Sequence, residues 1–413
     1  MFLVSGEKTE CFGCESCVQA CEKNAISMVE DKEGFRYPVT DKSLCVNCGK
    51  CFRVCPHDNS QLKYTQEKYA FGGYNSDSVS RFESTSGGAF SAIVESFCDR
   101  DYAIFGAEAQ GLKVFHSYIT DKSEIGKYRK SKYSQSVVGQ TFKEAKSFLK
   151  EGKKVLFSGT PCQIAGLRSF LGDTDTTELL TVEVICEGVP SPLYVRKLDD
   201  DIEKRYGKKI DFLDYRYTGK SLLSHGKWDF QVMRMGVGAT GEESFEKEIV
   251  TDRWFNPFWS VWLQHLMSRP SCYHCMYTTP ERVADITLGD LWGVHIYCPE
   301  LYGNNGGSSL VFCNTEKGKR VFEKAKEHMT GHELRPEDAL KYQSPMRKTI
   351  DMNADRDAFI ADLQSNMGYK EVNRKWAKRP SLKLLIQKYI WGNRQKVFFW
   401  NLGNKLMGGA KNA

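Results

Sequence analysis

Two short runs of cysteine constrain this chain more than any other feature, because each has the spacing of an iron–sulfur ligand set. "CFGCESCVQAC" supplies the first run and "CVNCGKCFRVCP" supplies the second. Both follow the C-x2-C-x2-C-x3-C pattern of two-cluster bacterial ferredoxins, in which the fourth cysteine of each run ligates the other cluster. We therefore expect two 4Fe-4S clusters, one held by Cys11, Cys14, Cys17 and Cys55 and the other by Cys45, Cys48, Cys51 and Cys21.

Zinc is the alternative occupant of such cysteines, but structural zinc sites usually use paired C-x2-C knuckles rather than runs of four. Between the runs, "AISMVEDKEGFRYPVT" predicts a β-hairpin with its turn at Glu33 and Gly34. Glu22 follows Cys21 where the bacterial pattern has proline, a change that has little consequence for ligation. Residues 1–67 are therefore expected to form a ferredoxin-type domain.

Length and composition indicate a cytoplasmic protein of two or three domains. A chain of 413 residues exceeds one ordinary domain. Its fifteen cysteines occur without a signal-peptide pattern, which favours a reducing compartment and metal or redox chemistry over disulfides. No run approaches the roughly 20 apolar residues that span a bilayer. We expect no nucleic-acid partner, because the excess positive charge lies in the C-terminal tail.

Residues 68–344 have the pattern of an α/β domain. "KKVLFSGTPCQIAGLRSFL" reads as a buried strand, a turn and an amphipathic helix, and "LLTVEVICEGVPSP" reads as the next strand. This order predicts a βαβ unit with parallel strands. Cys162 and Cys186 follow the two predicted strands, and ligand sites in such sheets lie beyond the carboxyl ends of the strands. The two thiols are therefore expected to share one crevice.

A second, incomplete cysteine motif lies in "RPSCYHCMY". Its two thiols cannot complete a four-ligand site alone, so one hypothesis is a third 4Fe-4S cluster held by Cys162, Cys186, Cys272 and Cys275. The alternative is that Cys162 and Cys186 are simply buried as small apolar side chains. The remaining cysteines occur in ordinary strand or helix contexts and are read as structural: Cys98, Cys298 and Cys313.

A glycine-rich stretch, "GVGATG", has the G-x-G-x-x-G spacing of a dinucleotide-binding loop at Gly236, Gly238 and Gly241. A dinucleotide site also needs a helix that opens within the motif and an acid ~20 residues further on. The alternating, acidic "EESFEKEIV" that follows does not read as such a helix. We therefore predict a β-hairpin with the glycines at its turn, rather than a nicotinamide site.

Six motifs occur in the order seen in one known family. They are "STSGGAFSAI", "KYSQSVVG", "VLFSGTPCQIAGLRSFL", "CEGVPSP", "RPSCYHCMY" and "RVADITLGDLWG". Together they resemble the coenzyme F-420 hydrogenase/dehydrogenase beta subunit family, including its bacterial members with a fused N-terminal ferredoxin domain and plant 7-hydroxymethyl chlorophyll a reductase. The resemblance covers roughly residues 11–318. It implies FAD beside a 4Fe-4S cluster, and it therefore favours the third cluster.

The resemblance also implies cofactor-binding residues in the α/β domain: Ser84, Thr85, Ser86, Gly87, Gly88, Lys132, Gly159, Thr160 and Asp290. The stretch 84–88 resembles a flavin-phosphate loop, in which small residues let backbone N–H groups approach a pyrophosphate at the start of a helix. Lys132 would offset phosphate or flavin charge, unless it is a solvated surface lysine. Gly159 and Thr160 would contact the isoalloxazine or the cluster loop.

Three further observations concern the chemistry of the site. The family's "AD…GDxWG" stretch matches Asp285, Gly289, Asp290 and Trp292, for which the alternative is a strand and turn with a core tryptophan. Glu187 stands where relatives commonly have histidine, which puts a proton-donor role at that position in doubt. His225, in the loop "LLSHGKW", is the best-placed candidate for a catalytic acid.

An iron–sulfur cluster passes one electron at a time, whereas most organic substrates change by two electrons, and a flavin can do both. We therefore expect an iron–sulfur flavin oxidoreductase. It would move electrons between a ferredoxin or another redox protein, the clusters, FAD, and F-420 or another small two-electron substrate. The alternatives are a non-catalytic electron-transfer subunit of a larger redox complex, and a reductase in a cell-surface polysaccharide pathway.

Residues 345–413 are expected to form a basic helical extension. From Lys370 onward the chain has eleven Lys or Arg residues and a single acid. "RPSLKLLIQKYIWGNRQKVFFWNLGNKL" also places apolar side chains at helical spacing among these lysines. This pattern fits an amphipathic helix that docks on a partner protein or peripherally on the inner membrane surface, and it equally fits a helix packed on the body.

Overall fold

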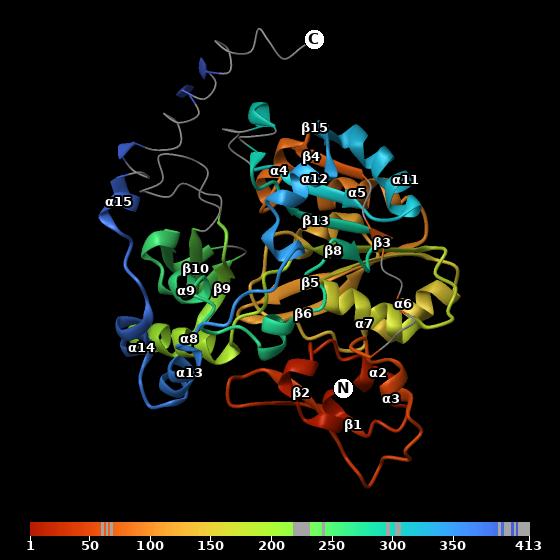
Figure 1. Ribbon diagram of the computed structural model, residues 1–413, viewed down its shortest axis with the longest axis horizontal. Helices are drawn as coiled ribbons and strands as arrows, with labels where there is room; N and C mark the ends of the chain where they lie inside the picture. Colours follow the sequence, from red (N-terminus) through yellow and green to blue (C-terminus); the bar gives the residue numbers. More distant parts are fainter. Residues whose placement is uncertain are drawn as a thin grey trace.

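The computed structural model describes the chain except residues 59–61, 63–64, 67–68, 218–231, 242–243, 295–297, 302–306, 387–389, 392–397, 400–401 and 404–413. Figure 1 shows three parts: an N-terminal domain, a large sheet domain that rests on it, and a smaller lobe beside the sheet domain. His225 lies outside the described residues, so the catalytic role predicted for it stays a prediction.

The N-terminal domain places its two cysteine runs in loops and short helices on either side of a hairpin. Its elements are α1 (Phe2–Ser5), η1 (Lys8–Glu10), α2 (Ser16–Ala20), β1 (Ile26–Glu30), β2 (Arg36–Thr40) and α3 (Lys50–Arg53). β1 and β2 pair antiparallel with Ile26 opposite Thr40, so the predicted hairpin is confirmed. Gly34 has φ 85° in the turn, a left-handed conformation that glycine adopts without steric cost.

An eight-stranded mixed sheet forms the centre of the molecule, in the order β15-β4-β14-β13-β8-β7-β5-β6. Its strands are β4 (Tyr69–Asn75), β5 (Tyr102–Gln110), β6 (Lys113–Ile119), β7 (Lys154–Gly159), β8 (Leu179–Val184), β13 (Ile286–Asp290), β14 (Ser309–Cys313) and β15 (Met329–Leu334). Strands β5, β7, β8 and β13 run parallel, while the outer strands are antiparallel to their neighbours. The predicted βαβ unit is β7, helix α7 (Pro161–Leu171) and β8, and it is confirmed.

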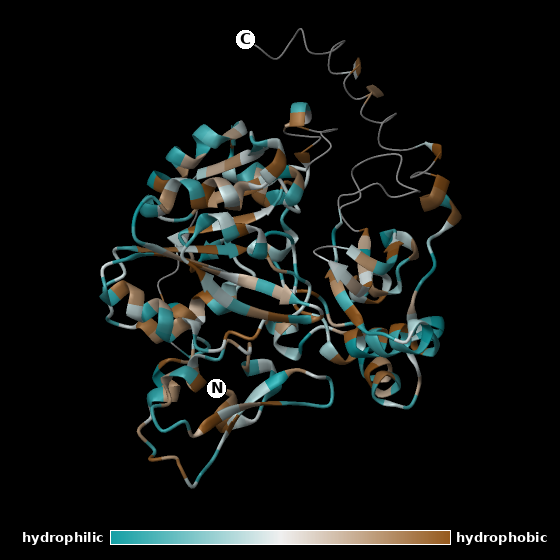
Figure 2. Ribbon diagram, turned by 180° about the vertical axis from the view of Figure 1, so that it is seen from behind, coloured by the Kyte–Doolittle hydropathy of each residue, from teal (hydrophilic) through white to brown (hydrophobic). Residues whose placement is uncertain are grey.

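Helices cover both faces of this sheet because its strands alternate their apolar side chains. Leu156 packs with α5 (Ala89–Phe97) and α11 (Glu316–Ala325) in one core cluster. Its neighbour Phe157 packs on the other side with α6 (Thr141–Lys150) and α7. Figure 2 shows the matching alternation of hydrophobic and hydrophilic residues along the covering helices. The fold is thus an α/β sandwich attached to a ferredoxin-type domain, as the sequence predicts.

The smaller lobe has its own core. A three-stranded antiparallel sheet of β9 (Ile210–Asp214), β10 (Met233–Gly241) and β11 (Ser244–Thr251) packs with α8 (Pro192–Tyr206), α9 (Pro257–Trp262), α13 (Arg356–Gln364) and α14 (Tyr369–Trp376). The predicted hairpin is confirmed, because β10 pairs with β11, but the prediction that the "GVGATG" glycines form its turn is wrong, because they lie within β10. Because α13 and α14 belong to this core, residues just beyond 344 extend the body of the protein.

Shorter elements connect these parts. They are β3 (Thr65–Gln66), α4 (Ser78–Glu83), η2 (Lys122–Tyr128), η3 (Arg253–Phe255), η4 (Pro270–His274), β12 (Glu281–Arg282), η5 (Pro299–Leu301), η6 (Lys326–His328), α12 (Pro336–Lys341), η7 (Ser344–Met346) and α15 (Leu382–Leu385). β3 pairs with β12 and so ties the link after the N-terminal domain to the sheet domain. Among the described residues, no helix is both long enough and apolar enough to cross a membrane.

Candidate functional site

The thiols expected to hold the first N-terminal cluster gather at one place. Burial raises the pKa of Cys14 to about 12, and the neighbouring thiols of Cys55 and Cys11 add to the rise. The same three thiols surround Cys17, whose pKa is also raised, chiefly by burial. The cysteine from the second run therefore joins three from the first, which is the crossed arrangement that the spacing predicts.

The second N-terminal thiol set lies closer to solvent. Cys21 and Cys45 are near Cys51, whose pKa is raised mainly by burial, and Cys48 is exposed. An apolar rim of exposed side chains accompanies this set on the same segment: Leu44, Val46 and Phe52. This set is therefore the one that an external redox protein would reach first.

The N-terminal domain contacts the sheet domain through α7. Ser16 Oγ donates a hydrogen bond to the backbone oxygen of Gly166 at 2.9 Å. A Cβ atom at Gly166 would lie only 3.1 Å from Cys14 Sγ, so a larger residue would separate the two domains here. Since Cys162 lies in the first turn of α7, one helix both touches the Cys14 thiol set and carries a thiol of the third group.

The four thiols of the third group converge beside the parallel strands. Cys162 opens α7 after β7, Cys186 follows β8, and Cys272 and Cys275 lie in and just after η4. All four line one cavity. Burial raises the pKa of Cys272 to about 11 and that of Cys275 to about 12, and neighbouring thiols of the group add to both shifts. Four half-buried thiols that meet at one place fit the ligand set of a 4Fe-4S cluster, because iron would replace their protons.

Arg269 connects this third thiol group to the N-terminal domain. The residue is 1% exposed, and its guanidinium donates to the backbone oxygens of Cys11 at 2.8 Å and Arg36 at 3.0 Å. It also donates to Gln135 Oε1 at 2.9 Å and lies 3.6 Å from Cys11 Sγ. Its own backbone oxygen accepts from the N–H of Cys272 at 2.9 Å. These oxygen acceptors are neutral, and a buried cation is costly without an anion nearby, so thiolate ligands on both sides would stabilise it.

A cavity of about 430 Å³ opens beside the third thiol group. The residues expected to bind a cofactor line it, with one exception, and they are Ser84, Thr85, Ser86, Gly88, Lys132, Gly159, Thr160 and Asp290. The exception is Gly87, whose N–H donates to Ser309 Oγ at 2.8 Å. A Cβ at Gly87 would lie 2.5 Å from the backbone oxygen of Gly73. The phosphate contact expected for Gly87 is therefore corrected: its amide is already used, and its lack of a side chain permits close packing of the loop.

A helix N-terminus and a lysine provide positive charge at the 84–88 side of the cavity. Gly88 is the N-cap of the nine-residue helix α5, so the positive end of the helix dipole lies at the cavity. Lys132 lies in the cavity wall, and its Nζ donates to the backbone oxygens of Arg129 at 2.7 Å and Lys127 at 3.1 Å. Burial lowers the pKa of Lys132 to about 8. Lys132 is therefore a cavity residue rather than a solvated surface lysine, and it can neutralise an anionic ligand.

Asp290 is paired with an arginine that sequence patterns did not single out. Arg216 Nη1 lies 2.9 Å from Asp290 Oδ2, and the Arg216 side chain is 7% exposed. Burial disfavours the charge on Arg216, but Asp290 and the Tyr133 hydroxyl raise its pKa overall. Trp292 lines the same cavity and is 51% exposed, so the reading of a core tryptophan is wrong. This side of the cavity offers both charged and aromatic contacts to a ligand.

The turn at Gly159 and Thr160 lies between the cavity and the third thiol group. The backbone N–H of Thr160 donates to Gln163 Oε1 at 3.0 Å, which fixes the start of α7. The Thr160 hydroxyl lies 3.2 Å from Cys162 Sγ, within hydrogen-bond distance. Thr160 is therefore placed to contact the ligand set, as the resemblance implies for the cluster loop.

Two protein families match parts of this chain. Residues 152–338 match the family described as the C terminus of the coenzyme F-420 hydrogenase/dehydrogenase beta subunit, and residues 10–59 match the 4Fe-4S dicluster domain. The 152–338 region belongs to that beta subunit family. No curated protein matches the chain. A chain in the xenon-derivatised F-420-reducing NiFe hydrogenase complex from Methanosarcina barkeri is similar, with 15% identity and a TM-score of 0.44, covering 68% of this chain and 90% of that chain.

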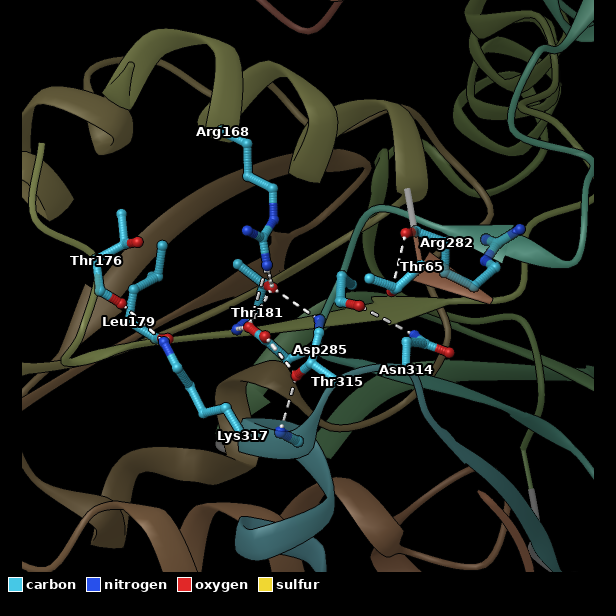
Figure 3. A network of polar contacts seen from close by, with 12 residues as sticks. Thr65, Arg168, Thr176, Leu179, Thr181, Arg282, Asp285, Asn314, Thr315 and Lys317 are labelled. Carbon is cyan, nitrogen blue, oxygen red and sulfur yellow. Dashed lines mark hydrogen bonds and ion pairs between the residues drawn. The ribbon is translucent and has the colours of Figure 1, made fainter. Parts of the chain in front are cut away.

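Within the beta subunit family region, Asp285 and Asp290 have different roles although one motif contains both. Asp285 does not line the cavity. Its carboxylate accepts from the Thr181 N–H at 2.9 Å, the Thr181 hydroxyl at 2.7 Å and Arg168 Nη2 at 3.2 Å, and from the Thr315 hydroxyl at 2.8 Å. Figure 3 shows these side chains pointing toward Asp285 from α7, β8 and the start of α11. Asp285 therefore holds the sheet and its helices together.

Replacing Asp285 with alanine is expected to lower the free energy of unfolding by about 3 kcal/mol, because buried donors lose their acceptor. Urea denaturation followed by tryptophan fluorescence measures this change. Asp173→Ala is the matched control, since Asp173 is exposed and its loss should cost less than about 0.5 kcal/mol. Equal stability of the two variants would contradict the structural role of Asp285.

Three arginines of the site, Arg216, Arg269 and Arg282, escaped the sequence reading. Arg282 forms a buried ion pair with Glu183 and donates to the backbone oxygens of Tyr277 at 2.7 Å and Thr279 at 2.8 Å. It thereby fixes the segment after Cys275 onto β8. Arg216 lies outside the motifs, whereas Arg269 and Arg282 open "RPSCYHCMY" and "RVADITLGDLWG", where the cysteines and aspartates drew the attention instead.

Proposed function

We propose that the protein is an iron–sulfur flavoprotein that transfers electrons between a ferredoxin-like donor and a two-electron organic substrate. Coenzyme F-420 is the first substrate to test. Three 4Fe-4S clusters and FAD would be its cofactors. The matches to the dicluster domain and to the beta subunit family support the redox class and the iron–sulfur chemistry.

The observation that carries this proposal is the contact between Cys14 and Gly166. It puts the buried N-terminal thiol set against α7, which begins at the third thiol group and the cavity. The more exposed thiol set, which includes Cys48, belongs to the same N-terminal domain. An electron could then pass from a partner at the surface to the cavity without leaving the protein.

The cavity offers an anionic ligand such as FAD a lysine and the start of a helix. Its volume of about 430 Å³ lies within the usual range for a small-molecule site. Lys132 and the start of α5 would hold the diphosphate, and the Gly159–Thr160 turn would keep the ring system near Cys162. When bound, FAD would supply the conversion between one-electron and two-electron chemistry. Its proposed binding residues lie in the same cavity as the third thiol group.

Replacing Lys132 with methionine is expected to weaken FAD binding about tenfold or more, because the diphosphate loses a cation. The wild-type affinity should also fall as pH rises above about 8, where free Lys132 loses its proton. Below that pH the cation is already present, so the affinity should change little. Fluorescence titration of flavin-depleted protein from pH 7 to pH 10 measures both effects. Lys143→Met, a lysine of α6 outside the cavity, is the control, and a pH profile that is the same in all three proteins would contradict this role.

The overall activity is tested with anaerobically purified protein, reduced ferredoxin and F-420, with NADH as a comparison. Repeated reduction of F-420 at the expense of reduced ferredoxin, with no other protein added, is the expected result. If the protein's own cofactors became reduced but neither F-420 nor NADH turned over, the enzymatic proposal would be contradicted. An electron-relay role would then be favoured. A reductase of a cell-surface polysaccharide pathway would instead transfer the electrons to a polysaccharide precursor added to the same assay.

We propose that the basic tail docks on an anionic membrane surface. Its described apolar side chains are largely exposed, with Leu382 at 73% and Phe398 at 62%. Removal of residues 380–413 is expected to lower pelleting with anionic vesicles at least severalfold, because both the basic charge and the apolar anchor are lost. Vesicles of neutral lipid are the control. Unchanged pelleting of the truncated protein would dismiss membrane docking by the tail.

A further inference from the structure

A separate group of metal-ligand side chains lies at the far end of the sheet, outside the cavity. Cys298, Glu300 and His332 each offer one donor atom, and these atoms lie within 4.8 Å of one another. Cys298 Sγ lies 3.1 Å from Glu300 Oε1, and His332 Nε2 lies 3.1 Å from the same oxygen. None of the three residues lines the cavity.

Two distant segments of the chain bring these donors together. Cys298 and Glu300 are at the η5 turn, where the Leu301 N–H donates to the Cys298 oxygen at 3.0 Å. His332 comes from β15, the edge strand of the large sheet, where it stands opposite Gly72 of β4. The backbone of a turn and of a paired strand therefore holds the donors in place before any ligand binds.

The environment of the group suits a metal ion with one open position. Cys298 is 1% exposed and packs in an apolar cluster with Leu291, Leu301 and Leu310. Glu300 and His332 are about half exposed, at 52% and 54%, so solvent reaches the other side. An apolar wall behind a thiolate strengthens its attraction to a cation, while the exposed side admits the ion and a water ligand.

We propose that Cys298, Glu300 and His332 form a site for a divalent zinc ion, completed by a water molecule. Thiolate, imidazole and carboxylate are the donors that zinc takes in proteins. With Zn–S of about 2.3 Å and Zn–N and Zn–O of about 2.0 Å, tetrahedral ligand atoms are about 3.3–3.6 Å apart. The 3.1 Å separations need to open by only a few tenths of an ångström to reach this geometry.

The zinc site would pin the edge strand β15 to the turn that follows the Asp290 and Trp292 segment. Metal binding would replace the proton of the Cys298 thiol, whose pKa burial raises in the free protein. The site is independent of the redox function proposed above. Its failure would leave that function untouched.

The test uses full-length protein with its iron–sulfur clusters loaded, incubated anaerobically with zinc chloride and then desalted. We expect one additional zinc per chain, and zinc-edge X-ray absorption with a single sulfur neighbour at about 2.3 Å. Cys298→Ser and His332→Ala should each lose this zinc. His328→Ala is the matched control, because His328 is also an exposed histidine near this edge and should leave zinc binding unchanged.

Three results would overturn the proposal. Zinc content that does not exceed background would mean that the three side chains only hydrogen-bond one another. A shell of four sulfur neighbours would place the zinc in vacated cluster sites instead. Retention of the zinc by both Cys298→Ser and His332→Ala would place it elsewhere on the chain, and the visible spectrum of the clusters would verify that both variants are folded.

Discussion

Replacing Cys272 with serine is expected to remove the iron of one 4Fe-4S cluster and to abolish turnover of any two-electron substrate. Cys272 lies with Cys162, Cys186 and Cys275 around the cavity, and a cubane that loses one thiolate of four is poorly held. The two N-terminal clusters should persist, because their ligands come from a separate domain. Iron and acid-labile sulfide assays on anaerobically purified protein measure the loss, which should be one third of the wild-type content.

The matched control is Cys98→Ala. Cys98 is fully buried in the sheet core but belongs to none of the three thiol groups, so its replacement should leave the iron content unchanged. If Cys272→Ser kept all of the wild-type iron, the third cluster would be wrong. The flavin proposal would then lose its connection to the N-terminal domain.

Replacing Arg269 with methionine is expected to lower the midpoint potential of the cluster held near Cys11 by on the order of 100 mV. Reduction adds negative charge to a cluster, and a buried guanidinium beside Cys11 Sγ stabilises that charge. Methionine has a comparable unbranched stem but no charge, so the reduced state becomes less favourable. A redox titration followed by electron paramagnetic resonance measures the shift directly.

Arg269→Lys is the control, because it retains the positive charge while losing the forked hydrogen bonds to Cys11 and Arg36. Lysine should therefore restore most of the potential although it loosens the contact between the domains. Potentials that are unchanged in Arg269→Met would show that the arginine has only a structural role. The comparison separates the charge of Arg269 from its packing.

The parts of the fold that the sequence predicts are those whose residues lie close together in the chain. Cysteine spacing indicated the crossed N-terminal ligand sets, and the alternation around "VLFSGTPCQIAGL" indicated the β7–α7–β8 unit. The hairpin around Gly34 follows from a local turn. Each of these patterns reflects short-range geometry, which a single sequence contains.

The rest depends on contacts between distant segments. Asp285 and Asp290 occur in one motif, yet Asp285 faces Thr181 and Arg168 while Asp290 faces Arg216. Which strand partner each carboxylate meets depends on the packing of the whole sheet, and the spacing of the motif does not reveal it. Arg269 likewise acquires its role only because the N-terminal domain docks beside η4.

Gly87 illustrates a different limit. The small residues of "STSGGAFSAI" indicate a loop that something approaches closely, but they do not say what approaches it. At Gly87 the close neighbour is the protein's own backbone at Gly73, whereas Gly88 faces the cavity. A glycine pattern therefore predicts close contact better than it predicts a ligand.

The most direct test is the content of iron, sulfide, zinc and flavin in the wild-type protein, purified without exposure to air. The two N-terminal thiol groups and the third group at the cavity predict iron and sulfide in equal amounts, sufficient for three 4Fe-4S clusters, and the flavin proposal predicts one FAD per chain. A colourless protein that contains zinc instead of iron, and that releases no flavin on heating, would contradict the account.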